Sequence, residues 1–74
     1  MTYNLVARRN AADFCREADA QPGDRLSNPT YWIGDWTITL VGTTDIIVRD
    51  NDGIERVCTS IGRDAAVTKK GKVR

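Results

Sequence analysis

The side chains that most often carry out catalysis are scarce in this sequence. It has no histidine, which removes the usual general base near neutral pH and the Ser-His-Asp and Cys-His nucleophile systems. Its lysines all lie within the last six residues, where water keeps an amine charged and unreactive. Cys15 and Cys58 belong to no CxxC motif and follow apolar patterns, so we expect both to be small core residues. The sequence therefore predicts a protein that is not an enzyme.

Carboxylates are concentrated around the segment Asp50-Asn51-Asp52-Gly53. An EF-hand register with Gly53 at the sixth loop position places Val48 first and Thr59 twelfth, where calcium needs carboxylates. A hairpin turn explains the segment better, because Asp and Asn side chains cap the backbone amides of such turns. We expect no metal and no cofactor. An enzyme is kept as a second alternative, which would use two of the carboxylates Asp45, Asp50, Asp52 and Glu55.

Aromatic side chains gather in one short segment. Tyr31, Trp32 and Trp36 are three of the five aromatic residues in the chain. A core of this size can hardly bury all three, and an exposed Trp or Tyr supplies the large, rigid contact area typical of a protein interface. The alternative is full burial of both tryptophans. The residues expected to bind a partner are Tyr31, Trp32, Asp35, Trp36, Asp50, Asp52 and Glu55.

Basic residues supply the first alternative function, nucleic-acid binding. Eleven Lys and Arg against ten Asp and Glu leave a net charge of +1, which gives no global reason to bind nucleic acid or an anionic membrane. The C-terminal end is locally basic and could neutralise several phosphates. A solvated, solubilising tail is the more common role of such a segment. The residues of this alternative are Arg8, Arg9, Arg63, Lys69, Lys70, Lys72 and Arg74.

The first half of the chain predicts a strand, a helix and a loop. Apolar residues alternate over residues 2–8, as in a short strand with one buried face. Asn10 is a good N-cap, and apolar residues then recur at helical spacing, which predicts an amphipathic helix over residues 11–20. Prolines, glycine and turn formers over residues 21–30 indicate a loop, which we expect Leu26 to anchor in the core.

From Tyr31 onward the apolar period changes to two, which is typical of strands. The strongest of these strands is expected to place Trp36, Ile38 and Leu40 on the core face. Two further strands, over residues 45–49 and 54–59, complete a three- to four-stranded antiparallel meander. The strand over residues 45–49 is apolar on both faces, so it is expected either to be central in the sheet or to pair with another chain. Beyond Ser60 the apolar pattern fades, and it predicts either one helical turn or a last short strand.

These elements predict one α+β domain over residues 1–68, with the helix packed on one face of the sheet, and a basic tail over residues 69–74. The expected function is a non-enzymatic protein-binding module, such as a small phage or mobile-element accessory protein that inhibits or regulates a larger bacterial complex. The expected partner is a protein, and a homodimer is kept as a possibility. No membrane contact is expected. Without an apolar signal segment, a cytoplasmic location with free thiols is favoured over a secreted protein with a Cys15–Cys58 disulfide.

Overall fold

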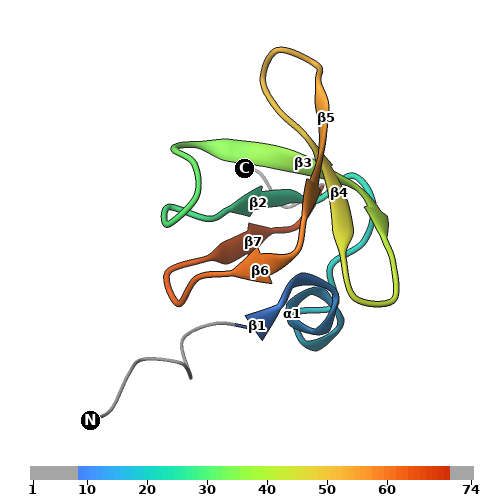
Figure 1. Ribbon diagram of the computed structural model, residues 1–74. Coiled ribbons are helices and arrows are strands. Elements are labelled where there is room, and N and C mark those ends of the chain that lie inside the picture. The colour runs from blue at the N-terminus through green and yellow to red at the C-terminus, as the bar shows by residue number, and fades with distance from the viewer. Residues whose placement is uncertain (1–8, 71–74) are drawn as a thin grey trace, which may run out of the picture.

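The computed structural model describes residues 9–70, which form one helix and a curled antiparallel sheet (Figure 1). Along the chain these elements are β1 (Arg9–Asn10), α1 (Ala11–Glu17), β2 (Arg25–Ser27), β3 (Asp35–Val41), β4 (Ile46–Arg49), β5 (Glu55–Cys58), β6 (Ser60–Ile61) and β7 (Ala66–Thr68). The main sheet has the strand order β5-β4-β3-β2-β7, and β1 pairs separately with β6. The α+β class agrees with the prediction. The strand expected over residues 2–8 lies outside the described residues.

Helix α1 begins where the sequence predicts and ends earlier. The side chain of Asn10 accepts a hydrogen bond from the backbone N–H of Asp13 at 2.9 Å, as an N-cap does. The helix ends at Glu17 instead of Ala20, because Asp19 adopts a left-handed conformation with φ of +55°. Its buried face consists of Ala11, Ala12 and Cys15.

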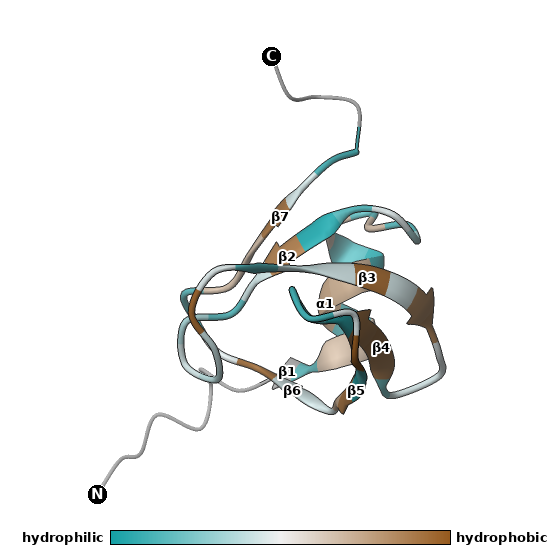
Figure 2. Cartoon of the chain, turned by 90° about the horizontal axis from the view of Figure 1, so that it is seen from above, coloured by the Kyte–Doolittle hydropathy of each residue, from teal (hydrophilic) through white to brown (hydrophobic). Residues whose placement is uncertain are grey.

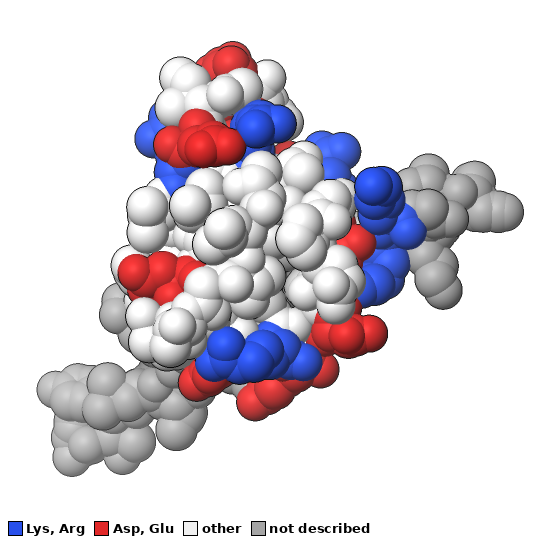
Figure 3. Space-filling view, turned by 90° about the vertical axis from the view of Figure 1, so that its right-hand side faces the viewer, with Lys and Arg blue, Asp and Glu red and all other residues white. Residues whose placement is uncertain are grey.

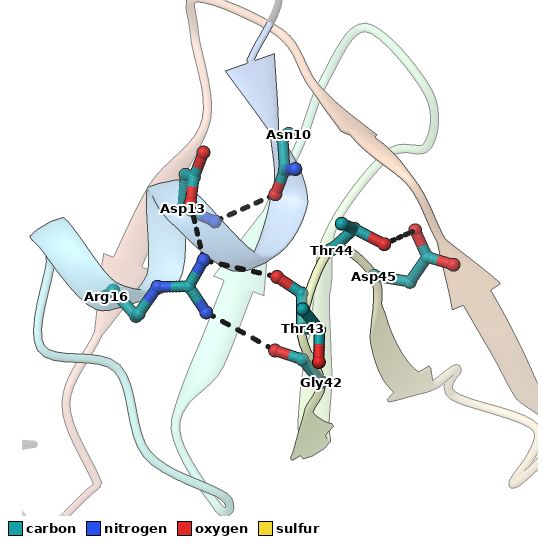
Figure 4. Close-up of polar contacts among 7 residues, drawn as sticks. All are labelled: Asn10, Asp13, Arg16, Gly42, Thr43, Thr44 and Asp45. Atoms are coloured by element: carbon teal, nitrogen blue, oxygen red, sulfur yellow. Dashed lines mark hydrogen bonds and ion pairs between the residues drawn. The ribbon is translucent and has the colours of Figure 1, made fainter.

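The helix is fastened to the turn between β3 and β4 (Figure 4). The backbone N–H of Ala12 donates to the Thr44 carbonyl at 3.1 Å. Arg16 also forms an ion pair with Asp13, and its guanidinium donates to the Thr43 carbonyl at 3.2 Å (Figure 4). Since α1 also contacts β1 and β6, it covers one end of the curled sheet instead of lying across a whole face.

The main sheet has five strands where three or four were expected, and β2 is the strand that the sequence analysis missed. Residues 21–30 were predicted to be a loop, but Arg25–Ser27 lie in the middle of the sheet between β3 and β7. Leu26 is fully buried, which confirms its role as the anchor of this segment. The prediction failed because a strand of three residues shows almost no alternation, and its partners are distant in sequence. Ala66–Thr68 form the short last strand that was one of the two alternatives.

A β-bulge in β3 overturns one predicted orientation. Ile38 pairs with Val48, but the next pair joins Leu40 to Ile47, so Thr39 is an extra residue on this strand. An inserted residue reverses the alternation of side chains beyond it. Leu40 was predicted to face the core and is instead 49% exposed.

The core lies inside the curl of the sheet and consists of small and aliphatic side chains (Figure 2). Strand β4 is an interior strand, between β3 and β5, so both of its edges are paired, and its Ile46 and Val48 side chains are fully buried. Figure 2 shows the apolar parts of β3 and β4 close to α1. The largest fully buried apolar side chains are Leu26, Ile38, Ile46, Ile61 and Val48.

Candidate binding groove

A groove of ≈ 510 Å³ lies between the aromatic segment and strands β5 and β6. One wall is formed by Tyr31, Trp32 and Trp36, and the opposite wall by residues 56–60, with Val48 between them. The volume falls within the range of about 300–1,000 Å³ that is usual for ligand-binding pockets. We call this feature the aromatic groove.

The two tryptophans of the aromatic groove stack on one another. Their ring centroids are 4.2 Å apart and their planes differ by 2°. The guanidinium carbon of Arg56 lies 5.5 Å from the centroid of Trp36, within the range of a cation–π contact. Trp32 and Trp36 are both half-buried, and Tyr31 is 44% exposed. Full burial of both tryptophans, the alternative left open by the sequence, is therefore wrong.

Asn28 holds the aromatic segment beside β6. It is fully buried, and its side chain accepts a hydrogen bond from the Gly62 N–H at 3.1 Å and donates to the Ser60 carbonyl at 3.4 Å. Its own carbonyl accepts from the backbone N–H groups of Tyr31 and Trp32 at 2.8 and 3.0 Å. Asn28 thus connects both walls of the aromatic groove, the side of β6 through its side chain and the aromatic segment through its backbone carbonyl.

Gly34 allows the segment to fold back. Its φ is +96°, a conformation that glycine adopts without strain and other residues rarely adopt. This reversal lies between Trp32 in the connection and Trp36 in β3, and it lets the two rings face each other. Strand β3 begins directly after this reversal, at Asp35.

Arg56 is the charged side chain of the groove, and the sequence analysis missed it. Its Nε donates to Asp50 Oδ2 at 2.8 Å, and its side chain is 53% exposed. The same carboxylate accepts from the N–H groups of Asp52 and Ile54 at 2.8 and 3.0 Å, so Asp50 organises the hairpin turn as predicted. The Arg56 hydrogen bond and the Ile54 N–H lower the pKa of Asp50, which keeps it ionised.

The other predicted partner-binding carboxylates do not reach the aromatic groove. Asp35 is exposed, but it precedes Trp36 in β3 and therefore points to the other side of the sheet. Asp50 is buried and occupied by the turn and by Arg56. Asp52 is exposed at the hairpin tip, and Glu55 pairs with Arg49 at 3.0 Å. Figure 3 shows this hairpin at the top, with charges of both signs side by side above a wide uncharged area.

The residues of the nucleic-acid alternative are not brought together in the described range. Arg63 is exposed near β6, whereas Lys69 is ion-paired with Asp24 at 2.8 Å and also donates to the Asp19 carbonyl. The backbone N–H of Lys70 donates to Asp24 at 2.7 Å, so these two residues dock on the domain instead of extending as a solvated tail. The remaining members, Arg8, Lys72, Arg74 and the side chain of Arg9, lie outside the described part of the chain.

The acidic turn and the two thiols are the remaining groups with chemical potential in the described residues. Asp45, Asp50, Asp52 and Glu55, proposed for the enzyme alternative, line neither the aromatic groove nor the second pocket beside α1. Cys15 and Cys58 are free and buried, and burial raises the pKa of Cys15 to about 11 and also raises that of Cys58. Thiols with raised pKa values are weak nucleophiles at neutral pH.

Residues 9–70 contain no group of three or more acidic or cysteine side chains placed to hold a metal ion. Over the same residues, no helix has the length and apolar character needed to span a membrane. Comparisons with protein-family models, curated proteins and solved structures found no match to this chain. The function is therefore argued from the groove itself.

Proposed function

We propose that this chain is a non-enzymatic protein-binding module whose partner occupies the aromatic groove. The observation that carries the proposal is the stacked, half-buried pair of Trp32 and Trp36 on the wall of an open groove. Trp, Tyr and Arg are the residue types that contribute most binding energy at protein interfaces. Tyr31 and Arg56 complete that set within the same groove.

An unsatisfied donor in the groove also supports binding. The Nε1 of Trp32 is buried and has no hydrogen-bond partner among the described residues. A buried donor without an acceptor costs about 1–3 kcal/mol. A partner that shifts the Trp32 ring and offers a carbonyl or carboxylate oxygen removes this cost on binding.

The proposed setting is that of a small phage or mobile-element accessory protein that inhibits or regulates a larger bacterial complex. A chain of 74 residues with one small core suits a role in which its surface, and not an enclosed active site, acts on a larger partner. A cytoplasmic location belongs to the same proposal, because buried free thiols persist in a reducing compartment.

The test begins with affinity purification from the native host and identification of the co-purifying protein by mass spectrometry. The affinity of that partner is then measured for the wild type, for the double variant Trp32→Ala/Trp36→Ala, and for Leu40→Ala. Leu40 is a matched apolar control, since it is 49% exposed and does not line the aromatic groove. We expect the double variant to lose at least a hundredfold in affinity and the control to stay within twofold. A folded double variant with full affinity contradicts the proposal.

A further inference from the structure

Strand β5 is an open edge of the sheet, and this edge borders the aromatic groove. In the described residues β5 pairs with β4 on one side and with no strand on the other. Residues 56–60, which include three of the four residues of β5, form one wall of the groove. In Figure 2, the side of β5 away from β4 faces the connection between β2 and β3, which carries Tyr31 and Trp32. A strand added to β5 would therefore lie in the groove.

The alternation of hydrogen-bonded and non-bonded pairs between β4 and β5 shows which backbone groups of β5 point away from β4. The Asp50 N–H donates to the Ile54 carbonyl at 2.9 Å, so these two residues are a hydrogen-bonded pair of the β4–β5 hairpin. Bonded and non-bonded pairs alternate along an antiparallel ladder. Arg56 and Cys58 are thus bonded to β4, whereas the N–H and C=O groups of Glu55 and Val57 point away from it.

The pairing of β4 with β3, at the other end of β4, independently gives the same assignment of bonded and non-bonded residues. The Gly42 N–H donates to the Asp45 carbonyl at 2.8 Å, which makes Leu40 and Ile47 a bonded pair of β3 and β4. The backbone of Ile47 is therefore turned toward β3. Its opposite neighbour Val57 consequently presents its backbone groups on the free edge.

The charge of the groove indicates the chemistry of an incoming strand. Arg56 is the one residue lining the groove that has a charged side chain. Its Nε is used by Asp50, but its two Nη atoms have no acceptor among the described residues. On a strand paired with Glu55 and Val57, the residue facing Arg56 is in a non-bonded pair, where opposing side chains come closest. A carboxylate there can receive both Nη groups.

We propose that the groove binds an extended peptide segment of the partner protein, which adds to β5 as a sixth strand. The segment carries Asp or Glu opposite Arg56, and an apolar or aromatic residue two positions away that packs against the Tyr31–Trp32–Trp36 wall. Strand periodicity places these two side chains on the same face. The inference rests on the proposed function and specifies the kind of partner.

A second copy of this chain fits the same edge less well. In the antiparallel register that bonds both Glu55 and Val57 of each copy, the two Arg56 residues stand directly opposite each other. Like charges in that position destabilise a strand pair. Charge complementarity therefore favours an acidic peptide over self-association.

The experiment pans a displayed library of random linear dodecapeptides against the full chain and measures the affinity of synthetic copies of the enriched peptides. We expect enrichment of an acidic residue and an apolar residue at positions i and i+2. Val57→Pro removes the outward N–H without removing a bond to β4, and Val57→Thr is the matched control that keeps it. The proline variant is expected to lose at least tenfold in affinity and the threonine variant less than twofold.

A scan of the peptide itself keeps the test independent of the folding of Val57→Pro. Methylation of single backbone nitrogens is expected to weaken binding at every second residue, because alternate N–H groups face β5. Replacing the peptide carboxylate by its amide is expected to lower the affinity for the wild type at least fivefold. The same replacement is expected to leave the affinity for Arg56→Gln unchanged. If the effect of methylation on affinity does not recur at every second residue, the peptide does not bind as an added strand.

Three other results have distinct meanings. If peptides still bind Val57→Pro, still bind after every methylation, and fail to bind Trp32→Ala/Trp36→Ala, the added strand is overturned and the proposed function stands. A library without binders overturns the peptide inference, while the proposed function is judged by its own co-purified partner. A wild-type dimer in sedimentation that dissociates in Val57→Pro shows that a second copy takes the edge, which also overturns the inference.

Discussion

Asn28→Ala is the substitution that most directly tests how the groove is built. The side chain of Asn28 is fully buried and makes hydrogen bonds to Ser60 in β6 and to Gly62, while the carbonyl of Asn28 accepts from the aromatic segment. Alanine removes both bonds and leaves the Gly62 N–H without its acceptor in a buried position. Leaving a buried donor unsatisfied costs about 1–3 kcal/mol, and the lost packing volume adds to it.

The second bond contributes less, because its donor–acceptor distance of 3.4 Å is near the upper limit for a hydrogen bond. We therefore expect the free energy of unfolding to fall by about 2–3 kcal/mol, a large fraction of the stability of a domain of this size. Urea unfolding followed by tryptophan fluorescence measures it. The signal also reports the groove, since Trp32 stacks on Trp36 only while the aromatic segment is held in place.

The matched control is Asn51→Ala, which makes the same substitution at an exposed position of the hairpin turn. Its effect is expected to stay within about 0.5 kcal/mol, as for most surface changes. If Asn28→Ala destabilises the protein no more than Asn51→Ala does, the hydrogen bonds of Asn28 do not hold the two walls together.

Three further predictions concern acid stability, thiol reactivity and the tryptophan stack. Hydrogen bonds from Lys69 and the Lys70 N–H lower the pKa of Asp24 to about 2, below its unfolded value of about 3.9, so the stability that this carboxylate contributes is complete above pH ~4 and is lost as the pH falls toward 2. Urea unfolding between pH 2 and 5 is expected to show a weaker pH dependence for Asp24→Asn; an unchanged slope contradicts this. The thiols of Cys15 and Cys58 are expected to react with Ellman's reagent at pH 7 at least a hundredfold more slowly in the folded than in the urea-unfolded protein, and equal rates refute their burial. Far-ultraviolet circular dichroism is expected to show an exciton couplet from the stacked rings that disappears in Trp32→Phe; a couplet that persists in this variant rules out the stack.

The parts of the fold with long, regular periodicity were accessible from the sequence. The N-cap at Asn10, the strands β3, β4 and β5 and the turn at Asp50 each follow from local rules that neighbouring residues obey together. Strand β2 was missed because three residues, Arg25–Ser27, carry almost no periodic signal, and only their two strand partners make them a strand. The bulge at Thr39 is likewise a property of pairing, so the exposure of Leu40 could not be read from alternation alone.

The site was predicted in part for the same reason. The aromatic wall was visible as a cluster of residue types, whereas the opposite wall depends on the position of β5 in the sheet. The sequence does carry a signal for Arg56, because Arg56 is two residues before Cys58 in the same strand and therefore shares its inward face. The prediction for Asp50 took charge at a turn as available for a partner, although the carboxylate of Asp50 is bonded within the turn itself.

The position of the tryptophans at the rim of the core follows from the size of the domain. Among the described residues, no aromatic side chain is fully buried; Phe14, Trp32 and Trp36 pack against the core while remaining partly exposed. A core assembled from Ala, Cys, Val, Leu and Ile side chains under a five-stranded sheet has no room for an indole ring. The rings therefore lie at the rim of the core and line the groove between the edge strand β5 and the connection before β3. Since the same two rings shield the core and line the groove, truncating them changes stability together with affinity, and Trp→Phe substitutions separate the two effects better than Trp→Ala.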